Sequence, residues 1–178
     1  EPPLNDTVIK RSFRAMTTPS DIIAFWTDAG PQKWFARDAG FDAAIREQFE
    51  AAHHAAACCE HDSWRSTPDG SLALLLLLDQ FPRNLFRGSA HAFATDELAL
   101  SIAEEAIAAG HDQATEMPLR LFFYLPLEHA EDLGRQNRCV ELVRATGSAE
   151  YLKYAEVHRD IIARFGRFPH RNAVLGRT

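Results

Sequence analysis

The sequence lacks the features that would assign its 178 residues to a secreted or membrane protein. It has three cysteines, two adjacent and one distant, which make a poor disulfide framework, and no signal peptide is recognisable at its N-terminus. We therefore expect a protein of the reducing cytoplasm. The longest apolar run, Leu72 to Leu78, is far below the roughly 20 residues of a membrane-spanning helix, so no membrane partner is expected.

Basic charge is also scarce. The formal net charge is −6, which argues against a nucleic-acid partner, because such proteins need a basic footprint for the phosphate backbone. There are three lysines, so 16 of the 19 basic residues are arginine. Genome composition can cause this bias; alternatively, some arginines grip carboxylates or phosphates with their planar guanidinium groups. Residues 159–178 hold five arginines and one acid, Asp160.

No segment alternates apolar and polar residues as a β-strand does, whereas helical signals run along the whole chain. We expect an all-α protein with seven to nine helices, no sheet and a single domain over residues 1–178, because the connections are short. Pro82 is expected to end the helix that precedes it. The predicted helical segments are 18–30, 41–59, 68–80, 95–110, 118–125, 127–145 and 148–166.

Three segments combine aromatic residues, a proline and ionisable groups more densely than an ordinary core or surface does. They are DQFPRNLFRG (residues 79–88), FFYLPLEHAEDL (122–133) and HRDIIARFGRFPHRN (158–172). Each carries a helix break beside bulky aromatic residues, and such breaks are tolerable where they satisfy one another's freed backbone groups. We therefore predict that the three segments meet in space, and that Asp79 pairs with Arg83.

His158 lies on the apolar stripe of the last long helix, with Tyr151, Ala155, Ile162 and Phe165 at helical spacing. This position predicts a mostly buried imidazole. Since an unpaired buried polar group is costly, we also predict a hydrogen bond from His158 to a carboxylate or a backbone carbonyl.

The three segments supply the candidate ligand-binding residues. Our first hypothesis is a helical scaffold whose Arg/His/Asn-rich pocket binds an anionic small molecule or an acidic peptide segment, with Arg83, Arg167 and Arg171 as the main anion contacts. The second is that the polar groups only hold helix ends together. The third is an acid/base or hydrolytic enzyme that uses His129 or His158 with Glu128. The candidate ligand-binding residues are Arg83, Asn84, Arg87, Tyr124, Glu128, His129, His158, Arg159, Arg167, His170, Arg171 and Asn172.

One spacing is typical of a metal site. His54, Cys58 and His61 stand at i, i+4 and i+7, which would place three ligands on one helix face, but no other segment offers a fourth ligand. We expect no metal here. We also expect no cofactor, because the sequence has no glycine-rich phosphate loop, no G-x-S-x-G and no H-E-x-x-H.

The same segments carry a family resemblance. DQFPRNLFRG followed by AFATD (92–96), YLPLEHAEDL and HRDIIARFGRFPHRNAVLGR, together with the upstream FW (25–26) and KWF (33–35), resemble the bacterial domain-of-unknown-function 924 family. The resemblance extends from about Ile22 to the end and implies an all-helical fold of antiparallel pairs like the tetratricopeptide-repeat superfamily. It implies no activity. Family members continue past the LGR, so we expect a native C-terminal tail beyond Thr178. Ala130 stands where the family commonly has serine, which argues against a nucleophile there.

Overall fold

The computed structural model describes residues 17–178, and the regular secondary structure of this part is all helical, without a β-strand. The predicted all-α class is therefore confirmed. None of the described helices is long and apolar enough to cross a membrane, and the N-terminal residues in which a signal peptide was sought lie outside the described part. The α-helices are α1 (Pro19–Ala29), α2 (Pro31–Trp34), α3 (Ala39–Ala57), α4 (Pro68–Leu75), α5 (Phe81–Leu85), α6 (Asp96–Ala108), α7 (Leu125–Glu128), α8 (Leu133–Ala145) and α9 (Ala149–Phe165). Shorter turns are η1 (Asp62–Ser66), η3 (Ala90–Phe93), η4 (Leu119–Phe123), η5 (Pro169–Arg171) and a π-helical turn, Leu76–Gln80.

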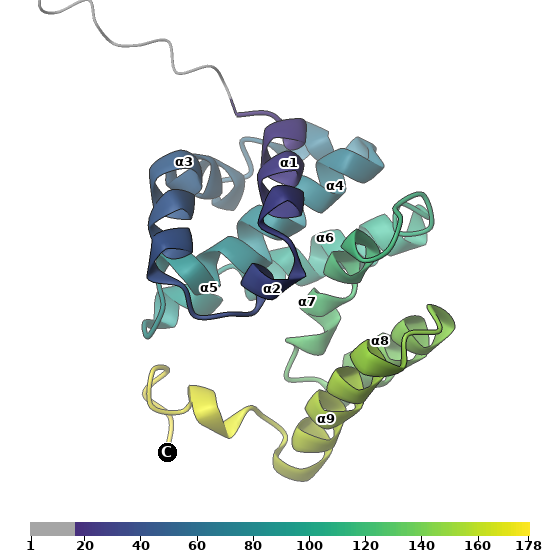
Figure 1. Cartoon of the computed structure of the whole chain (residues 1–178). Coiled ribbons are helices and arrows are strands. Elements are labelled where there is room, and N and C mark those ends of the chain that lie inside the picture. The colour runs from purple at the N-terminus through teal and green to yellow at the C-terminus, as the bar shows by residue number, and fades with distance from the viewer. Residues whose placement is uncertain (1–16) are drawn as a thin grey trace, which may run out of the picture.

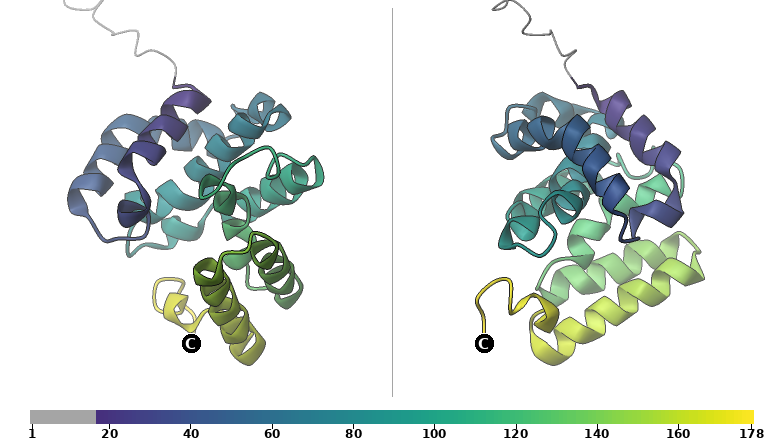
Figure 2. Two further views of the ribbon diagram at one scale, coloured as in Figure 1. Left: turned by 45° about the vertical axis from the view of Figure 1, so that its right-hand side comes forward. Right: turned by 60° about the vertical axis from the view of Figure 1, so that its left-hand side comes forward.

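The helices fall into two groups joined by α7. Helices α1 to α6 pack together in the first group, and α8 and α9 form an antiparallel hairpin below them (Figure 1). The chain after α9 turns back below the first group of helices, on the side of α5 (Figure 1), and the two rotated views also show it below this group (Figure 2). The expectations of a single domain and of a tetratricopeptide-repeat-like arrangement stay predictions.

An aromatic cluster fixes the N-terminal helices on the rest of the core. Trp26 and Trp34 stack with ring centroids 5.9 Å apart, and the indole N–H of Trp34 donates to the carbonyl of Trp26 over 2.7 Å. Phe122 meets both rings edge to face, at 5.5 and 5.0 Å. Large buried aromatic rings contribute both area and preferred geometry, so this cluster sets the position of short α2 against η4.

Several helix ends lie where local signals predict them. Thr18 caps α1 with a reciprocal capping box, Ser148 caps α9, and Gly166 ends α9 in the left-handed conformation at φ 66°. One of the predicted segments needs correction here. The segment 127–145 is interrupted after Glu128, and a new helix, α8, starts from the N-cap Asp132.

The structure also explains why His54, Cys58 and His61 do not lie on one helix face. Helix α3 ends at Ala57, so His61 does not continue the helix face of His54 and Cys58, and its ring stacks on Trp64 at 4.2 Å instead. Residues 17–178 contain no group of three or more His, Cys, Asp or Glu side chains able to hold a metal ion.

The expected break at Pro82 is wrong, because the helix continues to Leu85 through the π-helical turn. A proline removes one N–H and crowds the carbonyl four residues earlier, so nearby carbonyls lose their helical partners. Side chains replace those partners. His53 Nδ1 lies 2.8 Å from the Leu77 carbonyl, the Thr95 hydroxyl donates to Leu78 O over 2.5 Å, and Arg83 donates to Asp79 O. Three consecutive carbonyls are thus satisfied from outside the helix backbone.

Candidate functional site

The three unusual segments meet in the structure, as predicted. Asp79 of the first segment bonds His129 of the second, and Glu128 of the second pairs with His158 of the third. The backbone N–H of Phe168 also donates to Glu131 over 2.8 Å. The π-helical turn, the end of α7 and the middle of α9 therefore form one polar centre.

Asp79 and His129 form the innermost pair. Asp79 is 1% exposed, and one of its oxygens lies 2.7 Å from His129 Nδ1 and 3.4 Å from Arg83 Nη1. Burial opposes ionisation of this carboxyl group, but the charges of Arg83 and His129 outweigh it and lower the Asp79 pKa to about 2. An ionised carboxylate only accepts hydrogen bonds, so His129 Nδ1 carries a proton, and in the neutral form of the ring Nε2 is an acceptor.

Glu128 and His158 form the second pair. His158 Nδ1 lies 3.0 Å from Glu128 Oε1 and 2.9 Å from the Tyr154 carbonyl, and because a carbonyl only accepts, this nitrogen also carries the proton. Burial raises the pKa of Glu128, against the opposing charges of His158 and His129. The neighbouring Cys139 is buried as well, which raises the pKa of its thiol and keeps it protonated rather than nucleophilic.

The prediction for His158 holds in part. Its hydrogen bond to a carboxylate and a carbonyl is confirmed, but its side chain is 31% exposed and thus only half-buried. Helix α9 packs its apolar face on α8, and the turn that carries His158 borders a pocket rather than the core. Phe165, at the end of the predicted stripe, is exposed.

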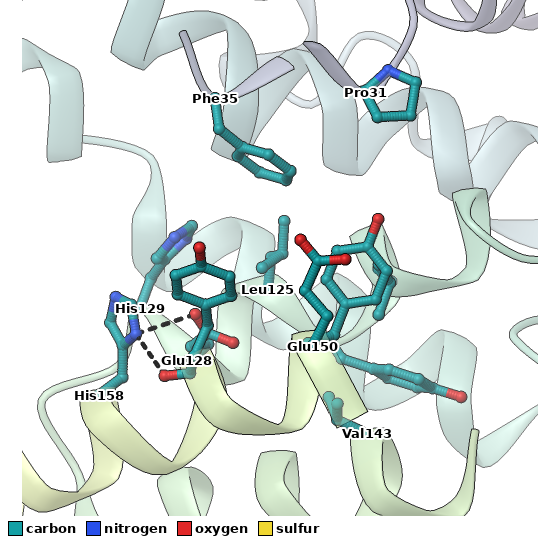
Figure 3. A pocket seen from close by; sticks show the side chains of 12 residues that line it. Pro31, Phe35, Leu125, Glu128, His129, Val143, Glu150 and His158 are labelled. Atoms are coloured by element: carbon teal, nitrogen blue, oxygen red, sulfur yellow. Dashed lines mark hydrogen bonds and ion pairs between the residues drawn. The ribbon is translucent and has the colours of Figure 1, made fainter. Parts of the chain in front are cut away.

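Both histidines and Glu128 line a pocket of about 500 Å³, a volume that suits a small molecule. Figure 3 shows Phe35 and Pro31 above the pocket, α9 below it, and the Glu128–His158 pair with His129 at one end. Glu150 rises from the first turn of α9 toward Phe35. Apolar and aromatic side chains make up the rest of the wall: Leu121, Tyr124, Leu125, Val143, Tyr151 and Tyr154.

Neighbouring buried groups hold this wall in place. Phe35 follows the anchored Trp34 and stacks on Phe122 with an interplanar angle of 17°. The fully buried Gln136 donates to the carbonyls of Glu128 and Ala130 over 2.6 and 2.8 Å, which fixes the turn that carries His129. Contacts within the protein therefore fix both Phe35 and the turn that carries His129.

The arginines lie behind or outside this pocket, each with a partner. Arg83 makes a two-pronged pair with Asp96, at 3.0 and 3.2 Å, and Arg171 reaches the same carboxylate at 3.3 Å. Arg171 also lies between the rings of Phe93 and Phe168, 4.6 Å from each centroid. These contacts are those of a structural ion-pair cluster, and they occupy two of the three arginines expected to bind an anion.

The remaining candidates lie outside the pocket wall. Asn84 and Arg87 both donate to Asp42 on α3, and none of these three residues lines the pocket. The others pair locally or with the C-terminus: Arg159 bonds Asp160, Arg167 bonds the Thr178 carbonyl, the exposed His170 lies against Phe168, and the Asn172 Oδ1 atom is buried without a partner. Of the twelve candidate residues, the pocket wall includes Tyr124, Glu128, His129 and His158.

Sequence reasoning missed the other side of the pocket. Phe35 stands in the KWF segment and Tyr154 and Glu150 stand on α9, but no local pattern indicates that α2 and α9 face each other. Asp96, which pairs with both Arg83 and Arg171, is predicted from the sequence only as part of the first turn of a helix.

Comparisons with known proteins are consistent with this description and add no activity. A family model described as "Bacterial protein of unknown function (DUF924)" matches residues 22–178. A solved structure of the protein of unknown function ATU0120 from Agrobacterium tumefaciens is 55% identical, with a TM-score of 0.88 over 90% of each chain. No curated protein matches the chain.

Proposed function

We propose that this chain, which belongs to the DUF924 family of bacterial proteins of unknown function, binds a small molecule in the pocket between α2, α7 and α9. The observation that carries the proposal is the Asp79–His129 pair at the wall of an aromatic pocket. A buried carboxylate fixes the ring and leaves Nε2 free of any hydrogen bond to the described residues. A few oriented polar groups in a mostly apolar hollow are typical of ligand sites.

Two exposed aromatic side chains support the same proposal. Phe35 is 59% exposed and Tyr154 is 55% exposed, and they border the pocket from α2 and α9. Large aromatic surfaces left in water beside a hollow are the surfaces that a ligand would cover.

A thermal-shift screen of small metabolites tests the proposal, since a ligand that binds only the native state raises the melting temperature. Tyr154→Ala, which truncates one wall, should abolish or reduce each shift. Phe165→Ala is the matched control, because Phe165 is an exposed aromatic residue on the same helix outside the pocket wall. Equal shifts in both variants and the parent protein would place binding elsewhere and refute the proposal.

The Asp79–His129 geometry also favours a second candidate, an acid/base enzyme. A carboxylate that orients an imidazole toward a pocket is the arrangement that general bases use, and His129 is the residue placed for that role. Product analysis of any ligand found in the screen distinguishes the two. An enzyme would convert the ligand and lose turnover in His129→Gln while still binding it, whereas a binding protein returns the ligand unchanged.

A further inference from the structure

The polar groups of the pocket wall accept hydrogen bonds more readily than they donate them. Glu128 and Glu150 carry the carboxyl groups of this wall, and the Nδ1 atoms of His129 and His158 are engaged with Asp79 and with Glu128 and Tyr154. In the neutral form of each ring the remaining Nε2 atom is an acceptor, and the hydroxyls of Tyr151 and Tyr154 can both donate and accept. The residues that line this pocket include no lysine or arginine. A wall of acceptors and negative charge is complementary to a ligand that donates hydrogen bonds and carries positive charge.

We infer that the ligand of this pocket is an organic cation, a protonated amine on an apolar or aromatic body. The inference rests on the proposed function and specifies its ligand class. It replaces the anionic ligand expected from the sequence, because Arg83 and Arg171 are committed to Asp96 and do not line the pocket.

Glu150 is the strongest single observation. Glu150 is exposed, and its carboxylate forms no hydrogen bond or ion pair within residues 17–178, while the side chain points across the pocket toward Phe35 (Figure 3). A position in the first turn of α9 accounts for an acidic residue there, since the helix dipole favours it. The position does not account for the direction of the side chain. An ammonium group in the pocket would supply the missing partner.

The aromatic walls suit the same ligand. Phe35 after α2, Tyr124 before α7, and Tyr151 and Tyr154 on α9 all line this pocket. Aromatic faces attract cations through their ring quadrupole, and an arrangement of aromatic rings with a nearby carboxylate recognises alkylammonium groups. At the other end, the unengaged Nε2 atoms of His129 and His158 would accept N–H groups of a second donor on the ligand.

Three probes with one aromatic body and different head groups test the charge: 2-phenylethylamine, 2-phenylethanol and 3-phenylpropionate, each titrated calorimetrically into the full chain at neutral pH. We expect the amine to bind at least about tenfold more tightly than either other probe, equivalent to about 1.4 kcal/mol. Glu150→Gln should weaken amine binding about fivefold, as loss of one partly exposed charge pair does, and leave the alcohol unchanged. Glu156→Gln on the same helix removes the same charge outside the pocket wall and should change neither.

The outcomes separate this inference from the proposed function. If the alcohol or the carboxylate binds as tightly as the amine and Tyr154→Ala weakens them all, the pocket binds ligands but not through positive charge, and the inference is wrong. Failure of the amine to bind at millimolar concentration also overturns it. If, in addition, no compound of the thermal-shift screen depends on Tyr154, the proposed function fails with it.

Discussion

Asp79 is the residue that joins the most parts of the site, since one buried carboxylate serves His129, Arg83 and the side-chain amide of Gln80. Removing one partner of a buried charge cluster leaves the other charges uncompensated, which costs more than the cluster contributes to stability. Because the pKa of Asp79 is lowered, its contribution to the free energy of unfolding changes with pH and can be measured in that way.

Asp79→Asn should lower the free energy of unfolding at neutral pH by about 3 kcal/mol, measured by urea denaturation. Because the native pKa is about 2 and the ordinary value is 3.8, the stabilisation by Asp79 is present above pH 3.8 and is lost as the pH falls toward 2. The variant should lack this acid-induced loss. Asp160→Asn is the surface control and should cost less than about 1 kcal/mol; equal losses in the two variants would contradict the role of Asp79.

Glu128 should behave in the opposite way. Burial raises its native pKa above the ordinary value of 4.5, so its ionisation weakens the fold as the pH rises from 4.5 through the native pKa. Glu128→Gln should therefore have a higher free energy of unfolding than the parent protein at pH 7.5, with the difference shrinking near pH 4. It should bind 2-phenylethylamine less tightly. If Glu128→Gln is instead less stable than the parent protein at pH 7.5, the pair with His158 stabilises the fold and the prediction is wrong.

At the scale of elements, the start of α4 is packed closely against η1. Gly70 lies in the first turn of α4, where an added Cβ would come within 2.1 Å of the Trp64 carbonyl oxygen of η1. The close approach of two backbones explains why a glycine stands there.

Gly70→Ala should destabilise the protein by at least about 2 kcal/mol, because either η1 or α4 must move. Gly40→Ala is the matched control: Gly40 also lies in a first helical turn, and its added Cβ would meet only the Asp38 side chain at 3.3 Å. Thermal unfolding followed by circular dichroism compares the two. Similar melting temperatures of the two variants would show that η1 can move away from Gly70 without a loss of stability.

The sequence predicts a helix end correctly where the residues that form the cap are neighbours in the chain. Thr18, Ser148 and Gly166 mark helix ends through their own side chain or backbone, and these ends are confirmed. The consequence of Pro82 depends instead on His53 and Thr95, which reach the freed carbonyls from 24 and 17 residues away. Such partners do not appear in any local pattern, so the predicted break is wrong.

At the scale of the whole molecule, the C-terminal segment is held by ion pairs with distant helices. Arg171 bonds Asp96 at the start of α6, 75 residues away, and Arg177 bonds Glu131 after α7 at 2.6 and 2.9 Å. The sequence predicts that the three segments meet, because each carries a break that needs partners. It does not identify Asp96 as their common acid, and this is why the arginines were expected to bind an anion.

Arg171→Met keeps much of the side-chain volume and removes the charge. We expect faster amide hydrogen exchange in residues 167–178, a loss of about 2 kcal/mol of stability and unchanged helical content, because the C-terminal segment loses its anchor between Phe93 and Phe168. Arg177→Met should affect only the last residues. Unchanged exchange in Arg171→Met would mean that apolar packing of Phe168 alone holds the segment.

The π-helical turn has a consequence for changes in chain length. A π turn contains one residue more than an α turn, so the segment Leu76–Gln80 corresponds to an α-helix into which a single residue has been inserted. Deleting one leucine from this turn would restore regular α-helical spacing and leave α4 and α5 near their present relative rotation, because a π turn accommodates its extra residue locally. The change would fall on the turn itself, which holds Asp79 and the carbonyls that His53 and Thr95 reach. A shorter chain with a more regular helix would thus keep its leucine core and lose the polar centre around Asp79.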